Sequence, residues 1–268
     1  MIINNAKVYR NGHFESASIE FDSHIRSFSP GEGMDACGAY IIPGLIDVHT
    51  HGAMGIDASD CTAEQIHHLA QFYSDNGVTS FCFTTLTVPA DELRSAMKNI
   101  RAYERFGGEA KCTGVHLEGP FVSRGKCGAQ NPDNIRKPDI ALFNELNELS
   151  GGMVRLITVA PEVEGALDFI REASKVCTVS LGHSTADYDQ AMAGFEAGAT
   201  HVTHLFNGME PFHHRKPGLV GAALTAGANV ELICDGVHIH PAMILAVHKM
   251  FGDRLIIVSD SLRCAGLC

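Results

Sequence analysis

The chain has 268 residues, of which 45% are hydrophobic, so it can build one large domain, or one large and one small domain, with a sizeable core. Its 20 Lys and Arg residues stand against 31 Asp and Glu residues, which gives a net charge of −11 with no basic run. This balance argues against nucleic acid or an anionic membrane as a partner. An anionic ligand would need locally placed cations or backbone N–H groups.

The first residues predict a small β domain over 1–40. The stretch "MIINNAKVYRNGHFESASIEFD" has apolar pieces broken by Asn11-Gly12, which is a hairpin turn signal. This start lacks the apolar core of a signal peptide, and no apolar run in the chain is long enough to span a bilayer. The nine cysteines form no CxxC pair, so we interpret them as reduced thiols and expect a cytoplasmic protein.

From residue 41 onward, short β-branched runs alternate with longer helical patterns. The runs are "IIPGLIDVH", "VTSFCFT", "CTGVHLEG", "VRLITVAP", "VCTVSLGHS", "HVTHLFN", "VELICDG" and "LIIVSD". Helices are predicted from the Thr62 cap to Gly77, from Pro89 to Gly107, and from a cap at Ser184 or Thr185 to Gly198.

Eight strand-like runs with helical intervals predict an α/β fold, a (β/α)8 barrel of the TIM type, over residues 41–268. A doubly wound sheet is the alternative. It usually has fewer strands and a Gly-rich first turn, and the sequence contains no GxGxxG or P-loop pattern.

Metal-ligand side chains stand at the ends of most of these runs. They are His49, His51, Glu118, His183, His204, Asp235 and Asp260. Each alone could be a polar residue that caps a strand, but the C-terminal strand ends of a barrel meet at one mouth. Imidazoles and carboxylates gathered there need a cation, and these ligand types fit a divalent transition metal. The candidates outnumber the ligands of one tetrahedral ion, which suggests two ions bridged by a carboxylate.

The positions of four histidines bear on this hypothesis. His49 and His51 are separated by one residue, so on a strand both point to the same side and can meet one ion. His116 lies two residues before Glu118 and could support a ligand from inside, although a satisfied core histidine is about as good an interpretation. His201 precedes His204 by three residues, so we expect it to face the other way and to be structural.

The motifs "PGLIDVHTHG", "HLEGPF", "LGHSTA", "THLFNGM", "DGVH" and "VSDS" resemble the N-acetylglucosamine-6-phosphate deacetylase family of the amidohydrolase superfamily. The likeness extends from about residue 41 to the last residues. Dihydroorotase-like and urease-like relatives usually bridge two metals with a carboxylated Lys on the fourth strand. Here the fourth run ends in "TVAPE", which has no lysine, and the resemblance implies that Glu118 takes the bridging position.

The resemblance also implies roles for individual residues. Glu118, His183 and His204 correspond to the core metal ligands, His49 and His51 to the pair that binds a second metal, and Asp260 to the catalytic aspartate beside the metal. The implied substrate contacts are Gln130, Asn207, Gly208, Arg215 and His238. Gln130 stands where the family often has His, so it can donate a hydrogen bond but cannot carry a proton. The implied cofactor is one or two divalent ions per chain, zinc or iron, and the arginine can come from a neighbouring subunit, which implies a homodimer.

We therefore expect metal-dependent hydrolysis of the acetamide of N-acetylglucosamine 6-phosphate, in amino-sugar catabolism. One alternative is a related amidohydrolase that acts on another N-acyl sugar or an N-acyl-D-amino acid. Another is an inactive truncated relative, because the chain stops at "SDSLRCAGLC", just after the last predicted barrel strand, where family members continue. On that reading the small β domain lacks its C-terminal half.

Overall fold

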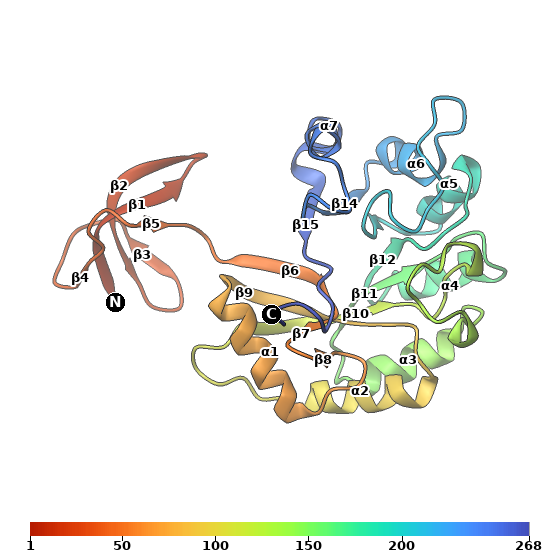
Figure 1. The fold of residues 1–268 in the computed structure, drawn as a ribbon, viewed down its shortest axis with the longest axis horizontal. Coiled ribbons are helices and arrows are strands. Elements are labelled where there is room, and N and C mark those ends of the chain that lie inside the picture. The colour runs from red at the N-terminus through yellow and green to blue at the C-terminus, as the bar shows by residue number, and fades with distance from the viewer. Residues whose placement is uncertain (268) are drawn as a thin grey trace. The chain divides into compact units, whose positions relative to one another are not determined.

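In the computed structural model, which describes residues 1–267, the chain divides into two compact units, and each carries its own sheet. The first unit is Met1–Leu45 and the second begins at Ile46. Figure 1 colours the first unit red and shows strands only, whereas the second unit alternates strands with helices. None of the helices in the described residues has the length and apolar character needed to cross a bilayer.

The first unit is a five-stranded sheet in the order β3-β2-β1-β4, with β5 paired to β1. Its strands are β1 (Ile2–Arg10), β2 (His13–Phe21), β3 (Ile25–Ser27), β4 (Met34–Asp35) and β5 (Tyr40–Ile41). Asn11 and Gly12 join β1 to β2 with φ values of 51° and 83°. Two successive positive φ angles define the hairpin turn that Asn-Gly favours, so the predicted turn is confirmed.

The second unit contains an eight-stranded parallel sheet in the order β15-β14-β13-β12-β11-β10-β9-β6. Its strands are β6 (Leu45–Thr50), β9 (Val78–Thr85), β10 (Lys111–Glu118), β11 (Val154–Val159), β12 (Thr178–Leu181), β13 (His201–Val202), β14 (Asn229–Ile233) and β15 (Leu255–Val258). A small hairpin, β7 (Gly52–Ala53) with β8 (Ile56–Asp57), follows β6. The sequential order of parallel strands confirms the predicted barrel class and excludes the doubly wound alternative.

Helices connect these strands on the outer side of the sheet (Figure 1). They are α1 (Ala63–Asp75), α2 (Ala90–Ala102), α3 (Ile140–Leu149), α4 (Ala166–Ala173), α5 (Tyr188–Glu196), α6 (Gly218–Ala226) and α7 (Pro241–Phe251). Short 3₁₀ turns cover Arg124–Lys126, Pro132–Asn134 and Gly252–Arg254. The predicted Thr62 cap is confirmed: its side chain accepts from the backbone N–H of Gln65, whose side chain accepts from Thr62 N–H.

Two helix boundaries differ from the prediction. Helix α2 ends at Ala102, short of Gly107, because Tyr103 adopts an extended backbone with ψ of 123°. Helix α5 is capped by Asp187, not by Ser184 or Thr185. The hydroxyls of Ser184 and Thr185 donate to the Glu162 carboxylate at 2.7 and 2.9 Å, so they are already used in the loop before the helix.

Alternation along the strands separates an apolar face from a polar one. Val115 and Leu117 lie in the apolar core between the sheet and the helices, whereas His116 between them faces the barrel interior. The same alternation repeats on the next strands, and hydrogen bonds join the interior side chains His116, Thr158, Thr203, Ser180 and His201. Barrel interiors are usually filled by branched apolar side chains, so this layer of hydrogen-bonded polar side chains is unusual.

The predicted orientation of His201 was wrong. The side chain faces the barrel interior, as that of His204 does, and does not point away from it. Its Nδ1 lies 3.0 Å from the Ser180 hydroxyl, which also contacts Thr203. His201 and Thr203 thus share the interior face, as residues two apart on a strand do. His204 reaches the interior only because its backbone departs from the strand, with φ of 28°.

The first and last strands of the barrel sheet are joined by hydrogen bonds at their C-terminal ends. Asp260 N–H donates to the His49 carbonyl at 3.0 Å, and His51 N–H donates to the Ser261 carbonyl at 2.8 Å. Further along, Met54 N–H donates to the Ala265 carbonyl at 2.8 Å. The segment that follows β15 therefore holds the mouth of a near-closed barrel together.

Candidate metal centre

The barrel places the predicted ligands at its C-terminal mouth. His49 and His51 come from the end of β6, and Glu118 is the last residue of β10. His183, His204 and Asp260 each lie two residues beyond a strand and have left-handed backbones, with φ of 46°, 28° and 48°. Such backbones are uncommon for residues other than Gly and gather at functional sites, where the surrounding structure holds them.

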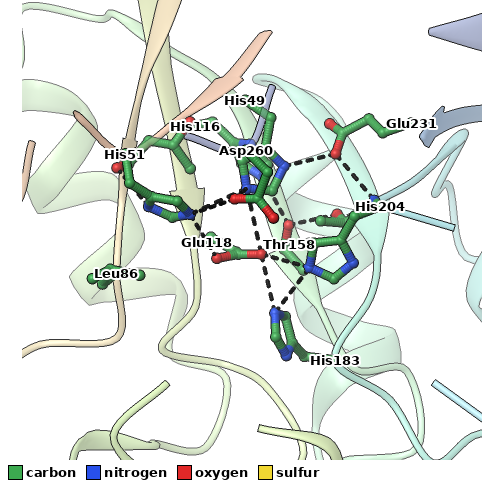
Figure 2. A network of polar contacts seen from close by, with 12 residues as sticks. His49, His51, Leu86, His116, Glu118, Thr158, His183, His204, Glu231 and Asp260 are labelled. Carbon is green, nitrogen blue, oxygen red and sulfur yellow. Dashed lines mark hydrogen bonds and ion pairs between the residues drawn. The ribbon is translucent and has the colours of Figure 1, made fainter. Parts of the chain in front are cut away.

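Glu118 lies at the centre of the group (Figure 2). Its Oε1 is 3.0 Å from His183 Nε2 and 2.9 Å from His204 Nε2, and it is 3.5 Å from His49 Nε2. Its Oε2 is 3.2 Å from His51 Nε2. The carboxylate thus contacts both pairs of histidines: Oε1 faces His183, His204 and His49, and Oε2 faces His51, so Glu118 is placed to bridge two cations.

Asp260 completes the set on the side of His49 and His51. Its Oδ1 lies 3.4 Å from His49 Nε2 and 3.3 Å from His51 Nε2. The Asp260 side chain is 19% exposed, whereas the Glu118 side chain is 3% exposed and that of His49 is fully buried. Asp260 is therefore the carboxylate of the cluster that a ligand in the mouth can reach.

Hydrogen bonds on the far side of each ring decide which imidazole nitrogen carries a proton. His51 Nδ1 lies 3.0 Å from the Thr84 carbonyl and His183 Nδ1 lies 2.8 Å from the Lys126 carbonyl. A carbonyl oxygen only accepts, so each Nδ1 carries the proton and the Nε2 of the neutral ring presents a lone pair. These lone pairs point at carboxylate oxygens, which also only accept.

The pKa values follow from this crowding in the absence of a cation. Burial opposes the charge on His49, but the carboxylates of Glu231, Glu118 and Asp260 outweigh it and raise the pKa of His49 to about 10. In the same way burial is outweighed at His51, whose pKa rises to about 9 beside Asp260 and Glu118. Burial would raise the pKa of Glu118, but the neighbouring histidines hold it well below its usual value. The carboxylates of the cluster are therefore stabilised by positive charge, which either protons on the histidines or a metal ion can supply.

The spacing fits a metal ion. Ligand atoms around a tetrahedral ion with bonds of about 2.0–2.1 Å lie roughly 3.3 Å apart. The nitrogen–oxygen separations in this cluster are 2.9 to 3.5 Å, and His183 Nε2 lies 3.1 Å from His204 Nε2. Two triads that share Glu118 have all their ligand atoms within 4.8 Å of one another: His49, His51 and Glu118, and Glu118, His183 and His204. The donor set and its spacing thus suit two cations bridged by Glu118.

A cavity of about 290 Å³ opens onto the cluster. It is lined by His51, Leu86, Glu118, Gly128, Ala129, Gln130, His183, His204, Asn207, Gly208, Ile233, His238, Asp260 and Leu262. Figure 2 shows Leu86 below His51, on the same side of Glu118. An apolar wall beside a cluster of ligand atoms is typical of a site for a small organic substrate.

Four of the predicted substrate residues line this cavity. Asn207 Nδ2 is buried and has no hydrogen-bond partner among residues 1–267, so it is a free donor. A Cβ on Gly208 would lie 3.0 Å from His183 Nδ1, so this position has no room for a side chain. His238 Nδ1 contacts Asp235 at 2.7 Å, and Asp235, which we had also considered as a ligand, is exposed and outside the metal cluster.

Gln130, the fourth, is engaged at both ends of its amide. Its Nε2 donates to Glu118 Oε2 at 2.5 Å, and its Oε1 accepts from Thr87 N–H at 2.6 Å. Gln130 is 4% exposed, and its hydrogen bond orients the carboxylate of Glu118. The substrate contact that the resemblance implies for Gln130 stays a prediction.

Arg215 lies apart from the other predicted residues. It is exposed and lines a separate cavity of about 650 Å³ between α5 and the start of α6. No Lys or Arg lines the cavity at the metal cluster in residues 1–267. Within residues 1–267, the cavity at the metal cluster thus has no cation of its own for a phosphate group.

Glu231 is the functional candidate that sequence reasoning missed. It is fully buried in β14 and its Oε2 lies 2.7 Å from His49 Nδ1. The signal was a glutamate at the second position of the apolar run "VELICDG", where a barrel strand has no reason to bury a charge without a partner. The sequence analysis instead selected Asp235 from this run, because that residue stands at the strand end.

These features define the class of protein. The profile of the Amidohydrolase family matches residues 40–266, which is most of the chain, and the chain belongs to this family. The residue groups that could bind a metal in this fold are present.

Individual relatives are more specific. The chain is 38% identical over 234 residues to the N-acetylglucosamine-6-phosphate deacetylase of Bacillus subtilis (strain 168), covering 85% of this chain and 59% of that protein. It is 38% identical over 230 residues to the N-acetylgalactosamine-6-phosphate deacetylase of Escherichia coli O157:H7, covering 85% of this chain and 61% of that protein. The crystal structure of N-acetyl-D-glucosamine-6-phosphate deacetylase from Mycobacterium smegmatis matches with a TM-score of 0.89 at 29% identity, over 100% of this chain and 73% of that one.

These relatives confirm the resemblance drawn from the motifs. The chain spans about three-fifths of the length of the two curated relatives, 59% and 61%.

Proposed function

We propose that this protein hydrolyses the acetamide of N-acetylglucosamine 6-phosphate to glucosamine 6-phosphate and acetate. The observation that carries the proposal is Asp260, a partly exposed carboxylate held against His49 and His51 at the floor of a small cavity. The likeness to deacetylases of 6-phosphorylated amino sugars supports the choice of substrate.

The cluster would hold one or two divalent cations, zinc or iron, on Glu118, His183, His204, His49 and His51. Such a cation acts as a Lewis acid that polarises a carbonyl and lowers the pKa of water. Imidazole and carboxylate ligands accept both metals, so the choice between them depends on supply as well as on the site.

Asp260 is the group that moves the proton. Burial would raise its pKa, but His49 and His51 outweigh this and keep the carboxyl ionised well below neutral pH. An ionised Asp260 can accept the proton of the attacking water. Once protonated, it can deliver this proton to the amide nitrogen, without which an amine is a poor leaving group.

The remaining residues bind and orient the sugar phosphate. Asn207 offers its unpartnered amide N–H, and His238, fixed by Asp235, stands at the rim of the cavity. Arg215 is proposed to supply the phosphate cation from a second copy of the chain, since it lies outside this cavity in its own chain. A homodimer follows from that assignment.

The test is a steady-state assay of acetate release from N-acetylglucosamine 6-phosphate, with the unphosphorylated sugar and an N-acetyl-D-amino acid beside it. Because the relatives are longer, the same assay is run on the protein with any further C-terminal sequence that its gene encodes. We expect the 6-phosphate to raise kcat/KM strongly. Equal kcat/KM values with and without the phosphate would contradict the proposed substrate.

A second candidate substrate is N-acetylgalactosamine 6-phosphate, because one relative of equal identity bears that name. The two sugars differ in the orientation of one hydroxyl, so the same assay with both phosphates decides between them. A higher kcat/KM for the galacto sugar would select the second candidate and leave the proposed chemistry intact.

A further inference from the structure

Glu231 is a charged side chain in a place where a charge is costly. It lies in the middle of β14 between Val230 and Leu232, and all three residues are fully buried. An isolated buried carboxylate costs several kcal/mol or more, so it must be compensated by partners.

Glu231 is hydrogen-bonded to His49 and to the turn that follows β13, and its Oε1 lies 3.9 Å from His201 Nδ1. Its Oε2 accepts from His49 Nδ1 at 2.7 Å and from the backbone N–H of His204 at 3.2 Å. Its own carbonyl accepts from Leu205 N–H at 2.8 Å. Figure 2 shows the carboxylate between the His49 ring and the His204 segment, on the side away from Glu118. One residue of β14 thus holds a ring from β6 and the turn that follows β13.

We propose that Glu231 is the positioning residue that presents His49 Nε2 to a cation at the His49 and His51 side of the centre. This inference rests on the proposed metal chemistry and adds a residue to it. The Oε2 of Glu231 already accepts from the His204 N–H and presents a further lone pair to His49, so it keeps the proton of His49 on Nδ1 and leaves the lone pair of Nε2 facing Glu118 and Asp260. Its negative charge also strengthens the imidazole as a ligand.

The contrast with the two neighbouring histidines gives the proposal its specificity. His51 and His183 are oriented by backbone carbonyls, of Thr84 and Lys126, which no side-chain substitution removes. His49 is oriented by a side chain, so a substitution of Glu231 that keeps an acceptor for the His204 N–H can change His49 alone. The effect should therefore concentrate on the cation held by His49 and His51.

The test compares cation binding to metal-free wild type, Glu231→Gln and Glu231→Asp. Glutamine keeps an oxygen that can accept from His49 and His204 but removes the charge, and aspartate keeps the charge but withdraws it from the ring. Cobalt(II) is titrated in by calorimetry, and its absorption bands report the ligand field at each step. We expect two binding steps in wild type, with the step assigned to His49 and His51 weakened about 10- to 100-fold in Glu231→Gln and the other step unchanged.

Thr158→Val is the matched control for disturbing the polar interior. Thr158 is buried in the same layer and contacts His116 and Thr203, not a ligand. This variant should keep both binding steps, even if its thermal midpoint drops. A role of Glu231 in folding alone would instead lower the midpoint of Glu231→Gln and weaken both steps together, or make Thr158→Val behave like it.

Several results would overturn the proposal. They are a Glu231→Gln isotherm that matches wild type at both steps, equal weakening of both steps, and a wild type that binds a single cation. If Glu231→Gln fails to fold, Glu231→Asp must weaken the step assigned to His49 and His51 more than the other step for the proposal to stand. Because these readouts need no substrate, loss of the proposed deacetylase activity and loss of this inference are separate outcomes.

Discussion

The two halves of the metal centre are built in different ways. On one side, His49 and His51 leave a single strand as an HxH pair, both rings are buried, and each Nδ1 has an acceptor, Glu231 or the Thr84 carbonyl. On the other side, His183 and His204 follow two different strands in left-handed backbones, and His204 Nδ1 has no hydrogen-bond partner in the part of the chain that the structure describes. The first half is specified by a short motif, whereas the second exists only when the barrel brings separate turns together.

The largest effect should come from Glu118, which both halves share. Glu118→Gln removes the bridging charge, so we expect bound metal to fall to background at both positions and acetate release to stop. Metal content by elemental analysis and turnover of the sugar phosphate measure this. Glu164→Gln, an exposed carboxylate paired with Lys137, is the control and should keep both. A Glu118→Gln protein that retains two cations would contradict the bridging role.

Asp260 is predicted to separate chemistry from cation binding. In Asp260→Asn, the ligands Glu118, His183 and His204 are intact, so metal at that side should remain. The loss of the proton carrier should lower kcat by about 10²- to 10⁴-fold. Parallel assays of metal content and kcat test this, and turnover near the wild-type rate with normal metal content would refute the role of Asp260.

Substituting a ligand in one half of the metal centre should leave the ion in the other half bound. His49→Asn and His51→Asn are each expected to reduce the metal content from two ions per chain to one, with the ion on Glu118, His183 and His204 retained. Activity should fall less than in Asp260→Asn, because one cation and the proton carrier remain. Elemental analysis of fully loaded protein gives the count, and one ion per chain in wild type would show that the second site does not form.

A further effect is a dependence of cation affinity on pH. The metal-free protein raises the pKa of His49 to about 10 and that of His51 to about 9, so both rings are protonated at pH 7. A cation must displace these protons, and its affinity should rise about tenfold per displaced proton for each pH unit between 6 and 9. Calorimetry in two buffers with different ionisation enthalpies counts the released protons. A pH-independent affinity would mean that the rings are already neutral.

The same contrast explains how much could be predicted from the sequence. The barrel was predictable because strand-like runs alternate with capped helices, as with Thr62 and Gln65 before α1. The ligand-type residues were predictable because they end strands, and the parallel strands of a barrel end at one mouth. Their convergence on Glu118 needed the motifs as well as the periodicity.

Other features depend on tertiary context. The role of Glu231 depends on its contact with His49, which is 182 residues away in the sequence, and no local sequence pattern predicts that contact. Hydrogen bonds from neighbouring strands hold the left-handed turn at His204. The prediction assumed an uninterrupted strand from His201 to His204, so it placed His201 on the wrong face of the sheet. The position of Arg215 depends on a surface loop, and its proposed phosphate contact depends on a second chain.

The hydrogen bonds that close the barrel mouth set an order of events during synthesis. The site needs Asp260, which is held by the His49 carbonyl and follows the last barrel strand, so it cannot be complete until residue 260 has left the ribosome and β15 has docked. A contact of such long sequence separation forms late in folding. Metal loading of the complete centre is thus a late step of maturation. An ion that binds there favours the closed barrel by mass action, so metal supply and the yield of folded protein are coupled.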